Sequence, residues 1–135
     1  MNAFLVIAAL LIIGFSALVI RANRERQKNQ DTVENYVTEI FSKQSYRPEV
    51  IASTTYGIPS FTLKFKTDDE KKHAISNGLT DMFIKKIQKL CGNLRPRGEE
   101  YDAGRAVSIF SAEDELRWAK EAAAYKKSKS NENNT

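Results

Sequence analysis

Histidine and cysteine, which most often carry metal or covalent chemistry, are almost missing from this chain of 135 residues. His73 is the only histidine and Cys91 the only cysteine. A single cysteine excludes a disulfide within the chain, and one residue of each kind is too few for the usual structural zinc sites. An intact helix between them would hold the two about 27 Å apart, which is too far for a Cys–His catalytic pair.

Phosphate-binding motifs are missing as well. The chain contains neither a G-x-x-x-x-G-K-[ST] loop nor a G-x-G-x-x-G turn. Two pairs of adjacent carboxylates remain: Asp68-Asp69 suits the start of a helix, and Glu99-Glu100 has no identifiable catalytic partner. The sequence therefore predicts no catalytic site, no metal site and no cofactor, and we do not expect an enzyme.

Excess positive charge is confined to one short segment. The whole chain has a formal net charge of +4, of which residues 21–30 supply +3 through four cations and one anion. The four cations are Arg21, Arg24, Arg26 and Lys28. Residues 31–135 hold seventeen basic and sixteen acidic side chains, so they are nearly neutral. Since non-specific binding to nucleic acid depends on clustered positive charge, we expect no nucleic-acid partner.

The most distinctive feature that the sequence does contain is one long apolar run. Residues 3–20 contain no charged side chain and would span about 27 Å as a helix, close to the thickness of the hydrocarbon core of a bilayer. We assign residues 1–20 to a transmembrane anchor in contact with lipid and residues 21–30 to a basic juxtamembrane linker. A removed signal peptide and a buried core helix are the alternatives. The run has no basic residue before it and no small-x-small site after it, which favours a retained signal-anchor.

The four cations also predict an orientation. Basic residues flank the cytoplasmic end of a membrane span, so the N-terminus should lie outside and the rest of the chain in the cytoplasm. In a bacterium the membrane would be the inner one. The lone Cys91 agrees with a reducing compartment.

Residues 31–127 have the length and patterning of one small domain. Its first helix is predicted from Thr32 to about Gln44, with Asp31 as the N-cap. An apolar stripe at helical spacing should face the core, and it comprises Val33, Val37, Ile40 and Phe41. The sequence leaves open whether this helix continues from the apolar run.

A β-hairpin is predicted next, with strands at residues 50–56 and 60–66. Its second strand alternates between apolar and polar residues, so Phe61, Leu63 and Phe65 should face the core. We place the residues between the strands, Tyr56 to Pro59, in a loop.

A second helix begins after Thr67, which forms a capping box with Glu70, and ends at Gly92. Its inward stripe is predicted to comprise Ile75, Leu79, Phe83, Ile87 and Leu90, widened by Met82, Ile84 and Cys91. The pair Asn77-Gly78 conflicts with a helix, but the stripe keeps its phase across that pair. We therefore predict one continuous or mildly bent helix.

The remainder contains a loop over residues 93–104, a strand over 105–110 and a helix capped by Ser111 that runs to about Lys127. This helix should turn Leu116, Ala119, Ala122 and Ala123 inward. Residues 128–135 are polar and predicted to be a disordered tail. The element order α-β-β-α-β-α after the anchor predicts an α+β fold, in which about three helices pack on a three-stranded, mainly antiparallel sheet.

Two functional hypotheses from different classes follow. In the first, the chain is a non-catalytic interaction module that is held at the membrane and binds a protein. In the second, the 93–104 loop binds a small anionic ligand or a lipid headgroup through Arg95 and Arg97. The candidate contact residues are Tyr56, Ile58, Pro59, Arg95, Arg97 and Tyr101.

Overall fold

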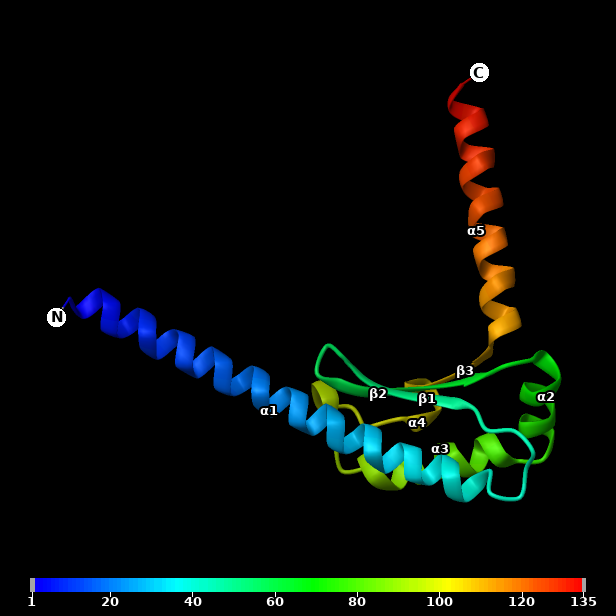
Figure 1. Ribbon diagram of the computed structural model, residues 1–135, viewed down its shortest axis with the longest axis horizontal. Coiled ribbons are helices and arrows are strands. Elements are labelled where there is room, and N and C mark those ends of the chain that lie inside the picture. Colours follow the sequence, from blue (N-terminus) through cyan, green and yellow to red (C-terminus); the bar gives the residue numbers. More distant parts are fainter. Residues whose placement is uncertain (1, 135) are drawn as a thin grey trace.

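The apolar N-terminal segment and the first helix of the domain are one helix, α1 (Ala3–Ile40). The computed structural model describes residues 2–134, and Figure 1 shows α1 running unbroken into the body of the domain. The helix continues because no glycine or proline occurs between Phe15 and Ile40. Asp31 is therefore not an N-cap, as predicted, but a mid-helix residue that accepts a hydrogen bond from Gln27 Nε2 at 3.0 Å.

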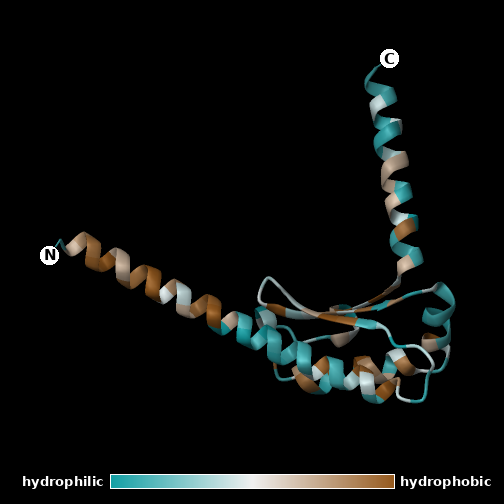
Figure 2. Cartoon of the chain, viewed as in Figure 1, coloured by the Kyte–Doolittle hydropathy of each residue, from teal (hydrophilic) through white to brown (hydrophobic). Residues whose placement is uncertain are grey.

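The two ends of α1 lie in different surroundings. Its apolar half is long and apolar enough to cross a membrane, and none of that stretch is buried by the rest of the chain (Figure 2). Met1, the first residue of the predicted anchor, lies outside the described residues. At the other end Val33, Val37 and Ile40 are buried, as the helical stripe predicts.

Strands β1 (Glu49–Thr55) and β2 (Ile58–Phe65) form the predicted antiparallel hairpin. Its turn is shorter than expected and consists of Tyr56 and Gly57, with φ of 52° and 79°. Two successive positive φ values are typical of a type I′ turn, which matches the twist of the flanking strands. Ile58 and Pro59 therefore belong to β2 and not to a loop. Proline is tolerated there because the third strand pairs with β2 only from Phe61 onward.

The third strand, β3 (Val107–Ser111), completes the sheet in the order β1-β2-β3. It pairs with β2 in parallel, so the sheet is mixed, and the prediction of a mainly antiparallel sheet is wrong. The physical reason is the long connection between β2 and β3, which carries helices. It returns the chain to the end of the sheet where β2 began, and such a crossover produces parallel neighbours.

The predicted second helix is two helices, α2 (Asp68–Ser76) and α3 (Leu79–Cys91). Gly78 separates them with φ of 72°, a left-handed conformation that helices do not contain. The prediction of one continuous helix is therefore wrong. The predicted inward residues of α3 are largely confirmed, since Leu79, Phe83, Ile87 and Cys91 are buried. The prediction is wrong for Ile75, Met82 and Leu90, which are exposed, and on α2 it is Ala74 that is buried.

The core lies between one face of the sheet and the helices α1 and α3 (Figure 1). Phe61, Leu63 and Phe65 of β2 are buried in it, as their alternation predicts. The opposite face of the sheet carries a group of small hydroxyl side chains from all three strands, Ser53, Thr55, Ser60, Thr62 and Ser108, together with Ile51, Ile58 and Phe110. In this α+β arrangement the core helices α1 and α3 cover only one face of the sheet.

The last helix, α5 (Ala112–Asn133), projects away from the domain (Figure 1). Leu116, Ala119, Ala122 and Ala123 were predicted to face inward but are all exposed. Only its first turns contact the domain, where the ring of Trp118 lies 5.6 Å from that of Phe110. The helix also continues through residues 128–133, which were predicted to be disordered. Thr135 lies outside the described residues.

Candidate functional site

A groove of about 620 Å³ runs between the β1–β2 hairpin and the segment from Pro96 to Ala106. That segment contains the short helices η1 (Pro96–Gly98) and α4 (Ala103–Ala106) and forms one wall. The hairpin and the open face of the sheet form the other wall and the floor. Its size suits a small ligand or a short peptide segment.

Most of the residues singled out from the sequence meet at this groove although they are up to 45 positions apart. Those that line it are Tyr56, Ile58, Pro59, Arg97 and Tyr101. Arg95, which precedes η1, is not among the lining residues. The structure therefore joins the hairpin and the long loop into one site, which the sequence treated as two separate candidates.

Tyr101 has a different role from the one predicted. Only 3 % of its surface is exposed, so its ring belongs to the core and is not a free contact group. Its hydroxyl donates a hydrogen bond to the carbonyl oxygen of Pro59 at 3.0 Å. Burial raises the pKa of Tyr101, which keeps that hydroxyl protonated as a donor. The side chain thus ties the loop wall of the groove to the hairpin.

Gln88, which sequence reasoning missed, holds the same wall from α3. Its Nε2 donates to the carbonyl oxygen of Tyr101, and its Oε1 accepts from the amide of Ala103, both at 2.8 Å. Asp102 accepts a hydrogen bond from the amide of Gly104 at 2.9 Å and so caps α4. Hydrogen bonds to α3 and within the loop therefore fix the position of this wall.

The rim of the groove carries both non-glycine residues with positive φ that the structure describes, Tyr56 and Arg97. Their φ values are 52° and 55°. The left-handed conformation costs a residue with a side chain about 1–2 kcal/mol. Tyr56 is also 89 % exposed, so packing in the domain does not offset this cost. Backbone strain of this kind is often kept at functional positions.

The lining offers hydrogen-bonding groups of every kind. The hydroxyls of the open sheet face both donate and accept. The loop wall adds charges of both signs. Its basic residues are Arg97 and Arg105, and its acidic residues are Glu99, Glu100 and Asp102. Such a lining can bind a polar segment along its length. In the sequence, the hydroxyl residues of the open sheet face were indicated only by the alternation along the strands, in which every second residue points away from the core.

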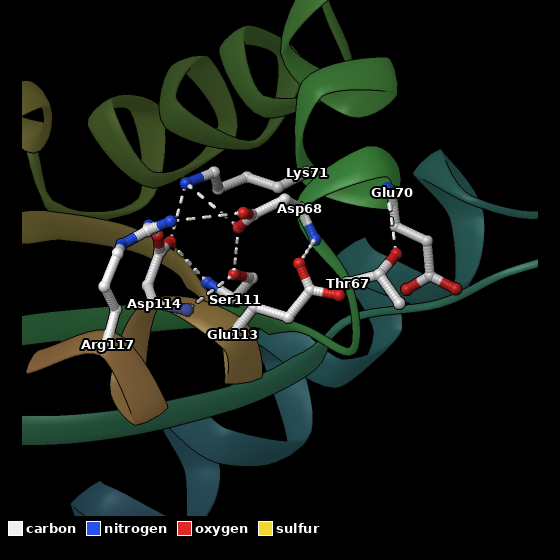
Figure 3. A network of polar contacts seen from close by, with 8 residues as sticks. All are labelled: Thr67, Asp68, Glu70, Lys71, Ser111, Glu113, Asp114 and Arg117. Atoms are coloured by element: carbon white, nitrogen blue, oxygen red, sulfur yellow. Dashed lines mark hydrogen bonds and ion pairs between the residues drawn. The ribbon is translucent and has the colours of Figure 1, made fainter. Parts of the chain in front are cut away.

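A second polar cluster connects the N-termini of α2 and α5 (Figure 3). Ser111 donates through Oγ to Asp68 Oδ1 at 2.5 Å and caps α5 in a box with Asp114, as predicted. Lys71 Nζ donates to Asp114 Oδ2 at 2.6 Å, and Arg117 pairs with both carboxylates. Ser111 is completely buried, and its hydroxyl donates to Asp68 and accepts from the amide of Asp114, so the cluster joins the two helices.

The lone histidine and cysteine lie in different surroundings. His73, on α2, has its Nδ1 2.6 Å from the hydroxyl of Tyr46. Cys91 is buried at the end of α3, where burial raises the pKa of its thiol. Among residues 2–134 no group of three histidine, cysteine or acidic side chains is arranged to hold a metal ion.

The basic linker is an exposed part of α1. Arg21, Arg24, Arg26 and Lys28 all lie on the solvent-accessible stretch between the apolar half and the domain. Arg21 forms an ion pair of 3.5 Å with Glu25 one turn away. The other three lie on the same straight rod, close to the point where it enters the domain.

Comparison of the chain with protein-family models, curated proteins and solved structures finds no match. Its function therefore has to be inferred from its own residues.

Proposed function

We propose that the chain is a single-pass membrane-anchored protein that presents a small non-catalytic α+β interaction domain to a protein partner at the cytoplasmic membrane surface. One observation carries this proposal. The helix whose last turns supply Val33, Val37 and Ile40 to the core begins with an apolar stretch that the domain leaves completely uncovered. Exposure of this uncharged and predominantly apolar stretch to water would be strongly unfavourable, whereas contact with lipid tails is favourable.

The continuity of α1 favours an anchor over its alternatives. A core helix of a soluble domain would be buried along its apolar stretch, and this stretch is not. A removed signal peptide is cut after a segment with small residues, whereas Val19, Ile20 and Arg21 at the end of this run are bulky or charged and helical. The basic residues from Arg21 to Lys28 favour an outside N-terminus and a cytoplasmic domain.

The groove is the surface we assign to the partner. Its hydroxyl floor and mixed charges suit an extended polypeptide, which presents both donors and acceptors along its length. Anchoring confines the domain to a surface and so raises its effective concentration toward other membrane-bound proteins. A modest affinity in the groove is then sufficient for association.

A small anionic ligand is supported less well. Arg97 and Arg105 line the groove together with three carboxylates, so the lining carries a net negative charge. Arg105 is moreover paired with Asp102 at 3.7 Å. Since an isolated anion needs a net excess of donors, this balance favours a polypeptide over a phosphate or a headgroup.

Photo-crosslinking tests the assignment of the groove. A photoreactive residue at Ser108, on the floor, should give a discrete protein adduct in membranes, and Thr62→Arg should abolish it by filling the groove. The matched control is the same probe at Glu121, which is exposed, does not line the groove and belongs to α5, the helix that projects away from the domain. Equal adducts from both positions, or adducts that survive Thr62→Arg, would remove the groove as the binding surface. A melting temperature raised by inorganic phosphate and dependent on Arg97 would favour the ligand.

A further inference from the structure

The β1–β2 hairpin points toward the membrane end of α1. Gln30 of α1 lies beside Val50 and Ala52, whereas Val37 and Thr38, further along α1, share a hollow with Arg47, Pro48 and Glu49. As residue numbers increase along β1, the residues of α1 beside it have decreasing numbers. The two elements therefore run antiparallel. Figure 1 shows the hairpin tip at the end of the domain from which the apolar half of α1 emerges.

The reach of the hairpin matches the distance to the bilayer. From Ala52 to Tyr56 the strand advances about 13 Å at 3.3 Å per residue. From Gln30 to Ile20 the helix advances about 15 Å at 1.5 Å per residue. The tip therefore ends close to the level of Arg21, where the apolar stretch gives way to charge. On each side of the hydrocarbon core the headgroup layer is roughly 5–8 Å thick, so this level falls within it.

The residue at the tip suits that layer. Tyr56 is 89 % exposed and adopts a left-handed conformation, at a turn position that favours asparagine or glycine. Tyrosine is enriched at membrane–water interfaces because its ring is apolar and its hydroxyl is polar. The neighbouring cations of α1, Arg21 and Arg24, are exposed at the same level and can contact lipid phosphates.

We propose that the hairpin tip is a second membrane contact, with the ring of Tyr56 in the headgroup layer of the bilayer that α1 crosses. A single helix leaves the domain free to rotate about the helix axis. A second contact to the side of that axis fixes which face of the domain faces the membrane. This inference rests on the anchoring part of the proposed function. It does not depend on what binds in the groove, although Tyr56 also lies on the rim of that groove.

A single-tryptophan measurement tests the contact. The variant Tyr56→Trp, Trp118→Phe places the only tryptophan at the tip. The wild-type chain is its matched control, because its only tryptophan, Trp118, lies at the opposite end of the sheet beside Phe110. Both full-length proteins are reconstituted into phosphatidylcholine vesicles that contain phosphatidylglycerol and a lipid with a headgroup nitroxide. We expect the tryptophan at the tip to be quenched severalfold more than Trp118 of the wild type and its emission to shift to the blue.

The outcomes separate this inference from the proposed function. Equal quenching of the two tryptophans in protein that floats with the vesicles would overturn the membrane contact and leave the anchor intact. Protein that does not float would contradict the anchor itself. If the double variant melts well below the wild type, Thr55→Trp in the Trp118→Phe background replaces it. Thr55 is an exposed residue at the end of β1, next to Tyr56. The membrane contact again requires that the tryptophan at position 55 be quenched severalfold more than Trp118 of the wild type.

Discussion

The side-chain amide of Gln30 on α1 hydrogen-bonds to the backbone of β1 at Ala52, in the way that a neighbouring strand would. The side-chain Oε1 of Gln30 accepts from the amide of Ala52 at 2.7 Å, and its Nε2 donates to the carbonyl oxygen of Val50 at 2.8 Å. One side-chain amide thus satisfies the outer edge of the sheet and fixes the anchor helix to the domain. Gln88 makes the same pair of bonds to Tyr101 and Ala103.

Replacing Gln30 by alanine should destabilise the domain by about 1–3 kcal/mol, because a partly buried amide and a carbonyl would lose their partner. Gln27→Ala is the control: the side chain of Gln27 bonds to Asp31 on the exposed helix surface, and we expect a change within about 0.5 kcal/mol. Urea unfolding in mild detergent, followed by the fluorescence of Trp118, measures both. Equal losses would show that Gln30 does not hold the rod to the sheet.

Replacing Tyr56 by asparagine should stabilise the domain by roughly 0.5–1 kcal/mol, since asparagine adopts the left-handed conformation of this turn more readily. Tyr56→Ala is compared with it, because alanine removes the ring but keeps the backbone cost. Thermal unfolding in detergent gives the two shifts. An asparagine variant less stable than the alanine variant would mean that the ring stabilises the domain itself, against its 89 % exposure.

Acid should weaken the junction between α2 and α5. The hydrogen bond from Lys71 and that from the Ser111 amide lower the pKa of Asp114 from 3.8 to about 2. A depressed folded-state pKa contributes stability above the unfolded value, so this contribution is complete above about pH 4 and is lost as the pH falls toward 2. Asp114→Asn should therefore flatten the fall in melting temperature between pH 5 and 2, relative to the wild type.

Asp69→Asn serves as the control for that titration. Asp69 lies in the first turn of α2 next to Asp68 but is exposed and outside the cluster of Figure 3. We expect its melting curve to follow the wild type across the same pH range. If the two variants flatten the profile equally, the acid sensitivity is a general charge effect and does not arise at the junction.

Gly78→Ala tests the break between α2 and α3. A Cβ at Gly78 would meet no atom within 4 Å, so any cost arises from the backbone, which has φ of 72°. We expect a loss of about 1 kcal/mol in urea unfolding. Gly14→Ala, in the middle of the apolar helix and equally unobstructed, should be neutral or slightly stabilising. An alanine variant at position 78 that is as stable as the wild type would favour a continuous helix.

Local signals predicted local structure well. The hairpin followed from strand alternation and Gly57, and the start of α5 followed from the spacing of Ser111 and Asp114, because each depends on residues a few positions apart. At Asn77-Gly78 two local signals disagreed. Apolar periodicity favoured one helix, but the backbone preference of Gly78 prevailed, and Ile75 was left exposed.

The other main errors concern relationships across long stretches of sequence. The direction of β3 depends on how α2 and α3 cross the sheet, which no residue of β3 encodes. An apolar stripe on α5 does not indicate whether another element of the domain packs against it. Leu116 of that stripe is exposed. The groove could not be predicted because it requires Pro59 and Tyr101 to be neighbours, and only the hydrogen bond between them, seen in the structure, reveals it.

The central claim is that residues 3–20 hold the domain at a membrane with its C-terminus in the cytoplasm. Cysteine labelling tests it most directly: Ser130→Cys in a Cys91→Ser background places one thiol on the exposed end of α5. We predict that the protein stays with membranes after alkaline carbonate extraction and that an impermeant maleimide labels it only after the cells are permeabilised. Release of the protein by carbonate, or labelling of residue 130 in intact cells, would contradict the account.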